Sequence, residues 1–247
     1  MKLLEAKEIY RVCATQLSLR DISFEIEEKG VYGFLSKDSA ELEALADVLA
    51  GAAETDGGSL RYKERELYAS DRLCAEIKRK IGYAPHKCFF DGDLTSFELL
   101  DLTGRAKGIE PDKRFRQIKE ALEITGLSRN RDTLIEELDL GEKKRLSIAN
   151  ALLGNPEVVI LCEPLRYLDA KQSSEIKRLV SMLSGKRLVL VFSVRPSDVE
   201  ELCGTVAIMS EGKMVLWEST EALLNKLREN QLGGLSDALD ALSEKGE

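Results

Sequence analysis

Several features that mark specialised classes of protein are scarce or missing in this 247-residue sequence. It has a single histidine and five cysteines, and no two cysteines stand in C-x-x-C spacing. Zinc centres and disulfide frameworks are built from such clusters, so we predict neither a metal site nor a set of disulfides. The scattered thiols indicate a reducing compartment such as the cytosol.

Long apolar runs and an excess of basic residues are also absent. No stretch of about 18 apolar residues occurs, and the first residues, MKLLEAK, do not resemble a signal peptide. Lys and Arg number 36 against 44 Asp and Glu, a net charge of -8, whereas nucleic-acid surfaces draw their affinity from basic residues. We therefore expect a cytoplasmic protein without a nucleic-acid partner, which would reach a membrane only through another subunit.

What is present is the pattern of an α/β protein. Apolar runs of strand length alternate with helical periodicities, which predicts parallel βαβ units. Two runs, 158–161 and 188–192, are apolar without alternation, as in strands buried on both faces of a sheet. The expected strands are 22–26, 31–35, 80–84, 158–161, 188–192, 206–209 and 213–217.

The helical patterns suggest how the chain is organised. From residue 93 to 138 only helical patterns occur, which predicts a helical subdomain (93–138) inserted within a single domain that spans 1–247. Residues 218–247 are expected to form a C-terminal helical tail, broken at two adjacent glycines. Capping-box spacing predicts helix starts at Thr95 and at Ser197.

The most informative segment is the turn after the predicted strand 31–35. A strand, a short polar turn and an amphipathic helix are the context of a phosphate-binding loop (P-loop), G-x-x-x-x-G-K-[ST]. Both glycines, the lysine and the magnesium-binding hydroxyl are missing, and an ordinary turn with Asp38 or Ser39 as helix N-cap explains the same residues. The eight positions read Ser36, Lys37, Asp38, Ser39, Ala40, Glu41, Leu42 and Glu43.

Electrostatics argue against a polyphosphate at this turn. Glu41 and Glu43 would face it with like charge, and two unit charges about 4 Å apart repel by roughly 4 kcal/mol at an effective dielectric constant of about 20. Such a penalty alone weakens binding on the order of a thousandfold. We therefore expect no productive binding of magnesium-ATP and no cofactor, unless the altered site still works.

A second segment carries a more specific pattern. Residues 138–152 read LDLGEKKRLSIANAL, and residues 158–170 read VVILCEPLRYLDA. In order and spacing they resemble the signature helix, Walker B strand and D-loop of ATP-binding cassette (ABC) ATPases, nearest in pattern to the ATPase subunits of ABC-2 or multidrug exporters. The resemblance extends over residues 21–215 and implies an α/β, P-loop NTPase-like fold with a mixed sheet core and an inserted helical subdomain.

Matched position by position, the resemblance implies that this chain lacks the residues with which the family binds phosphate and magnesium. Leu42 stands at the lysine position of the P-loop, and Glu43 at its magnesium-binding hydroxyl. Cys162 replaces the Walker B aspartate, and a thiol does not supply the hard oxygen that magnesium prefers. His86 replaces the Q-loop glutamine. We interpret His86 as a coupling or loop residue, because no base partner is visible, and Cys162 as a packed thiol.

The signature motif and the position of the family's switch histidine are altered as well. Asp139 and Leu140 stand for the serine and the first glycine of the signature, and Gly141 remains. The basic run 143–145 is expected to be a solvated helix face rather than a phosphate clamp. The position of the switch histidine falls on Val194.

Three further positions complete the resemblance. The aromatic residue that stacks on adenine is replaced by Cys13, unless Tyr10 takes its place from a shifted register. Glu163 stands at the general base and Asp169 at the D-loop aspartate, so both acids are kept. A base needs a bound substrate, so Glu163 is expected to be an idle acid at a strand end.

These observations favour an ABC-like subunit of a membrane transporter that does not bind or hydrolyse ATP productively by itself. The resemblance implies membrane permease subunits as partners, and an intact ABC ATPase or a second copy as the other half of an ATPase pair. The subunit would sit at the inner face of the membrane through the permease. Two alternatives stay open: a working ATPase in which Lys37 substitutes for the missing lysine, and a soluble interaction module that has lost transport.

Overall fold

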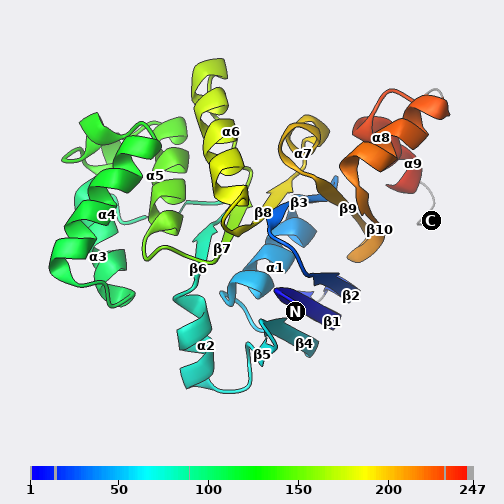
Figure 1. Cartoon of the computed structure of the whole chain (residues 1–247), viewed down its shortest axis with the longest axis horizontal. Helices are drawn as coiled ribbons and strands as arrows, with labels where there is room; N and C mark the ends of the chain where they lie inside the picture. The colour runs from blue at the N-terminus through cyan, green and yellow to red at the C-terminus, as the bar shows by residue number, and fades with distance from the viewer. Residues whose placement is uncertain (1, 14–15, 89, 231, 244–247) are drawn as a thin grey trace.

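The computed structural model describes residues 2–13, 16–88, 90–230 and 232–243, and the side chains at 13, 16, 17 and 243 lie outside this description (Figure 1). The chain folds as two β-sheets with helices between and around them, which confirms the predicted α/β class with a mixed sheet. None of the described helices is long and apolar enough to cross a lipid bilayer.

The larger sheet contains the strands that carry the candidate site. They are β3 (Gly30–Leu35), β6 (Ile81–Ala84), β7 (Val158–Cys162), β8 (Leu188–Ser193), β9 (Thr205–Ser210) and β10 (Lys213–Ser219). Their order is β10-β9-β3-β8-β7-β6, and every neighbouring pair is parallel except β10 and β9. β7 and β8 are buried along their whole length, as their apolar runs predict.

The smaller sheet is antiparallel and was largely missed from the sequence. Its strands are β1 (Leu4–Cys13), β2 (Gln16–Ile26), β4 (Gly57–Tyr62) and β5 (Arg65–Glu66), in the order β2-β1-β4-β5. Only the end of β2 was expected. The pairing of β1 with β2 shifts register between Ala6 and Ile9, and Glu8 between them has a left-handed φ of 49°. Such a bulge interrupts the alternation by which a strand is recognised.

Helix α1 (Ser39–Ala50) lies between the two sheets and contacts β2, β7 and β8. Its apolar residues join one continuous core with both sheets. On the other face of the larger sheet, α6 (Ala170–Ser184) and α7 (Pro196–Leu202) form a second core. α7 corrects the predicted capping box at Ser197: the helix begins at Pro196, and its N-cap Arg195 makes no side-chain cap.

Helices gather at one end of the molecule (Figure 1). They are α3 (Ser96–Ala106), α4 (Pro111–Ile124), the 3-10 turns η1 (Ser128–Asn130) and η2 (Ile135–Glu137), and α5 (Leu140–Leu152). α3, α4 and α5 share a third core, so α5 links this helical end to the sheet. The predicted capping box at Thr95 is confirmed, with both of its hydrogen bonds formed to Glu98. Helix α2 (Asp71–Lys78) follows the antiparallel sheet.

The C-terminal part lies at the opposite end (Figure 1). β10 continues to Ser219, so the expected helical tail begins at Thr220 rather than at residue 218, with α8 (Thr220–Glu229) followed by α9 (Leu235–Ser243). Gly233 and Gly234 separate the two helices, as predicted. The last residues of the expected tail, 244–247, lie outside the described residues.

Candidate functional site

The carboxyl ends of β3, β7 and β8 meet at one edge of the parallel sheet. The turn at 36–38 follows β3, Glu163 follows β7, and Val194 follows β8. His86 comes two residues after the end of the neighbouring strand β6. In open α/β sheets ligands bind at this edge, so it is the place to examine the predicted residues.

The turn after β3 is held together by Glu41. Ser36 Oγ donates a hydrogen bond to one oxygen of Glu41, and the backbone N–H of Gly212, in the turn between β9 and β10, donates to the other at 2.5 Å. The backbone N–H of Asp38 donates to Ser36 Oγ at 3.0 Å. Glu41 is only 4 % exposed, and burial raises its pKa. Glu41, at a P-loop glycine position, therefore links the turn after β3 to the turn between β9 and β10 of the same sheet.

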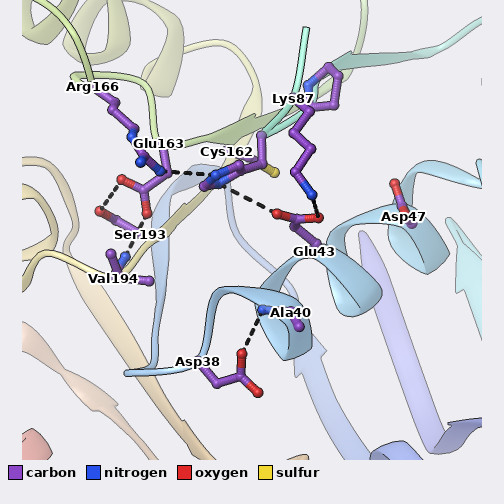
Figure 2. A network of polar contacts seen from close by, with 12 residues as sticks. Asp38, Ala40, Glu43, Asp47, Lys87, Cys162, Glu163, Arg166, Ser193 and Val194 are labelled. Carbon is purple, nitrogen blue, oxygen red and sulfur yellow. Dashed lines mark hydrogen bonds and ion pairs between the residues drawn. The ribbon is translucent and has the colours of Figure 1, made fainter. Parts of the chain in front are cut away.

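The N-terminus of α1 is closed by its own cap. Asp38 is the N-cap, and its Oδ1 accepts from the backbone N–H of Ala40 at 2.8 Å, so the expected alternative, Ser39, is not the cap (Figure 2). A carboxylate thus occupies the helix start, where an anionic ligand would bind. Leu42 is 3 % exposed and belongs to the core. Lys37 pairs with Asp240 of α9, with Nζ and Oδ1 2.6 Å apart.

Glu43 and His86 form a polar cluster across the site. His86 Nδ1 lies 3.8 Å from one Glu43 oxygen, and Lys87 Nζ lies 3.8 Å from the other (Figure 2). Arg166 Nη1 lies 2.9 Å from His86 Nε2. Because a guanidinium only donates, Nε2 is the acceptor and the imidazole proton sits on Nδ1, facing Glu43. Burial is the main cause that lowers the pKa of His86, so the ring favours the neutral form.

Lys144 is a site residue that the sequence did not reveal. The run 143–145 was expected to be solvated, but Lys144 is 2 % exposed and Arg145 is 7 % exposed. Lys144 Nζ donates to the carbonyl oxygens of Pro85, His86 and Cys162, at 3.0, 3.3 and 3.0 Å. This ammonium ties the segment after β6 to the end of β7, and nothing in the local sequence distinguishes it from a surface lysine.

Cys162 and its surroundings offer no ligand set for a metal. Its thiol is 3 % exposed, and burial raises its pKa to about 12, so the neutral thiol dominates at neutral pH. Within the described residues, no group of three or more His, Cys, Asp and Glu side chains is placed to hold a metal ion.

Glu163 is enclosed by the segment that follows β8. It is 2 % exposed and has a left-handed φ of 49°. The backbone N–H of Val194 donates to Glu163 Oε1 at 2.7 Å, and Ser193 Oγ lies 3.3 Å from Oε2 (Figure 2). Arg195 Nε lies 4.0 Å from the same oxygen, and Arg195 Nη2 lies 2.7 Å from Asp198. The acid at the general-base position is thus bonded within the chain, and Val194 brings no titratable ring.

The residues at the signature and D-loop positions are helix caps. Asp139 caps α5, where Asp139 Oδ1 accepts from the N–H of Glu142 at 2.7 Å. Asp169 caps α6, with Oδ1 accepting from the N–H of Gln172 at 2.8 Å. Leu140 is 60 % exposed. A Cβ at Gly141 would lie 2.6 Å from the carbonyl oxygen of Tyr167, so the close packing of α5 on the D-loop requires this glycine.

The structure brings together residues from the predicted P-loop, Q-loop and Walker B positions, and leaves little room among them. The cavity that they surround has a volume of about 10 Å³, the space of a single water molecule. It is lined by Ser39, Leu42, Glu43, His86, Cys162, Glu163 and Phe192. Asp139, Leu140, Gly141 and Asp169 are not part of this lining. Tyr10 lies in β1 with its ring against Gly57, whereas the side chain of Cys13 lies outside the described residues.

Comparisons with known proteins agree on one family. The family model described as "ABC transporter" matches residues 19–166. The bacitracin transport ATP-binding protein BcrA of Bacillus licheniformis is 29% identical over 215 residues, which are 86% of this chain and 68% of BcrA. The uncharacterized ABC transporter ATP-binding protein YxlF of Bacillus subtilis is 30% identical over 215 residues, 87% of this chain and 68% of YxlF.

Solved structures extend the likeness to the whole fold. The dimeric MJ0796, a bacterial ABC transporter cassette, superposes with a TM-score of 0.81 at 18% identity, covering 87% of this chain and 98% of that one. The ATP binding subunit of an ABC transporter superposes with a TM-score of 0.84 at 20% identity, covering 98% and 99% of the two chains.

Proposed function

Because the chain belongs to the ABC transporter family of ATP-binding subunits, we propose that it is a cassette that has given up ATP turnover and serves as the structural or regulatory half of an ATPase pair. One observation carries the proposal: the loops that would surround a triphosphate are bonded to one another around a cavity of about 10 Å³. Asp38, Glu41 and Glu163, which stand at positions that an ATPase would direct at nucleotide, are bonded within the chain instead.

The residues present do not fit a magnesium triphosphate. Asp38 places a carboxylate at the start of α1, and Glu43 adds a second one near the same helix end. A polyphosphate there would meet like charge at short range. The cation that the second hypothesis assigns to phosphate, Lys37, is paired with Asp240 instead. These contacts favour the non-hydrolysing subunit over a working ATPase with unusual ligands.

A docking face on the helical subdomain supports a role in a transporter. Leu102 of α3 and Phe115 and Ile124 of α4 are 58 %, 51 % and 42 % exposed on this group of helices, and contiguous apolar surface of this kind marks interaction sites. Phe115 lines a groove of about 190 Å³, where the guanidinium of Arg131 lies 4.6 Å from the ring centre of Phe97. We assign this face to an apolar segment of a permease, through which the subunit would sit at the inner face of the membrane.

The proposal predicts the absence of productive nucleotide binding. Isothermal titration of the purified chain with ATP, with and without magnesium, should show no saturable binding at micromolar concentrations, and micromolar affinity would overturn the proposal. Any phosphate release should remain at background and be equal in Glu163→Gln. A rate that falls in Glu163→Gln would establish the ATPase alternative.

The transporter role is tested separately, by co-purification. The full chain, expressed with the permease subunits of its own transporter, should retain them, and Phe115→Glu should release them. Met182→Glu is the matched control, because Met182 is 55 % exposed on α6, away from the docking face. Retention of the permease by Phe115→Glu would remove this face from the interface, and no association at all would favour the interaction module.

A further inference from the structure

A crevice opens at the amino end of the parallel sheet, the edge opposite the closed site. Its floor includes the first residues of three neighbouring strands, Ile81, Val158 and Leu188, which are adjacent in register. They are 4 %, 7 % and 2 % exposed. Tyr62 of β4 and Ile77 of α2 complete the apolar walls. The volume is about 340 Å³, within the range of small-molecule sites.

The rim of this crevice is strongly basic in a chain whose net charge is -8. Five cationic residues line it, with a single carboxylate, Glu157, among them. Glu157 is shared between two of the cations, Lys63 and Lys80. The cationic residues are Lys29, Lys63, Arg65, Lys80 and Lys186. Charge within the crevice is therefore far from balanced.

Two of these cations are left without an acidic partner. Arg65 pairs with Glu76 at 2.7 Å, but in the part of the chain that the structure describes no carboxylate lies within 4.0 Å of Lys29 or Lys186. Both precede strands that pair directly, since Gly30 lies opposite Leu188 in the β3–β8 ladder. The fold thus places Lys29 and Lys186 on the rim of one apolar floor, where an anionic ligand would pair with them.

We propose that this crevice binds a small organic anion with an apolar body, such as a phosphorylated or carboxylated amphiphile. The apolar body would cover Ile81, Val158 and Leu188, and the anionic head would bind Lys29 and Lys186. A volume of about 340 Å³ matches the size of a small-molecule ligand. The site is separate from the nucleotide-facing loops and does not depend on the proposed function.

Octyl phosphate is the probe that joins both chemical features. Titrated into the full chain by calorimetry below its micellar concentration, it should bind at one site per chain, and the affinity should fall as salt is raised. Inorganic phosphate and octyl glucoside each supply one half of the probe, and both should bind at least tenfold more weakly. No binding of octyl phosphate, or equal binding of octyl glucoside, would overturn the proposal.

Charge reversal locates the binding. Lys29→Glu with Lys186→Glu should weaken octyl phosphate at least tenfold, while Lys113→Glu with Lys171→Glu, two exposed lysines of α4 and α6, should change the affinity less than twofold. Both double variants alter the net charge equally, and circular dichroism verifies that both are folded. An equal loss in the two would mean that only net charge matters and would refute the site, as would unchanged affinity in the first.

Discussion

The two ends of the parallel sheet treat their polar residues in opposite ways. At the carboxyl end Glu41, Lys144 and Glu163 are buried and bonded to neighbours in the chain, and Glu163 lines a cavity of only about 10 Å³. At the amino end Lys29 and Lys186 are exposed beside a crevice of about 340 Å³. At the carboxyl end the hydrogen bonds of these side chains stabilise the fold. At the amino end the charges of Lys29 and Lys186 are available for a ligand.

The sharpest way to break this comparison is to remove one lysine from each end. Lys144→Met should lower the free energy of unfolding by about 3 kcal/mol, because one buried and two partly buried carbonyls lose a charged donor and an unsatisfied buried acceptor costs about 1–3 kcal/mol. Lys186→Met should change it by less than about 0.5 kcal/mol, as is usual for exposed positions. Urea denaturation at pH 7 measures both, and equal effects would contradict the difference between the ends.

Returning the P-loop glycine should weaken the protein rather than restore a site. Glu41→Gly removes the acceptor of the Ser36 hydroxyl and of the Gly212 N–H, and it places glycine in the first turn of α1. We expect a loss of about 2 kcal/mol, from unsatisfied buried donors and from backbone entropy. At the amino end, Glu157→Ala breaks only exposed ion pairs and should cost less than about 1 kcal/mol. The midpoints of urea unfolding compare the two, and a neutral Glu41→Gly would mean that Glu41 is not an anchor.

The contributions of Glu41 and Glu157 to the stability of the fold should depend on pH with opposite signs. Burial raises the pKa of Glu41, so its favourable contribution is complete below about pH 4.5 and is lost as pH rises through the raised value. The hydrogen bond with Lys63 is the main cause that lowers the pKa of Glu157, so its contribution is present above about pH 4.5 and is lost as pH falls through the lowered value.

Glutamine variants of the two residues test these opposite pH dependences. Relative to the native chain, Glu41→Gln should gain stability as pH is raised from 5 to 8. The amide oxygen still accepts from the Gly212 N–H, the amide NH₂ donates to Ser36 Oγ in the reverse direction, and no charge is buried. Glu157→Gln should be less stable than the native chain near neutral pH and should approach it in acid. Thermal unfolding across this pH range tests both, and parallel profiles would show that the two carboxyls have similar environments.

The sequence predicted the helices and strands better than it predicted the side-chain contacts of the candidate site. Buried strands β7 and β8, and the Thr95 capping box, carry local signals in composition and spacing, and all are confirmed. At Ser197 the same capping spacing failed, because Pro196 favours the first helical position and starts α7 earlier. A local sequence pattern therefore predicts where a helix begins only when no second start signal lies beside it.

The roles of Glu41 and Lys144 had no local signal. The partner of Glu41, Gly212, lies 171 positions further along the chain, and Lys144 reaches carbonyls of two different segments. A lysine in a basic helical run is usually solvated, so the prediction of a solvated face was reasonable and wrong for this residue. Only the packing of α5 against β6 and β7 decides where its ammonium goes.

The smallest effect is expected at Lys37, an exposed cation of the carboxyl end. Lys37 and Asp240 form an ion pair with exposures of 49 % and 60 %, and such pairs contribute about 0.2–1 kcal/mol. A double-mutant cycle of Lys37→Ala and Asp240→Asn should give a coupling of about 0.5 kcal/mol that fades with salt, and neither variant should change the response to magnesium-ATP. If Lys37→Ala instead abolished a measurable nucleotide affinity, the carboxyl end would hold a phosphate-binding cation, and the contrast between the two ends of the sheet would fail at this residue.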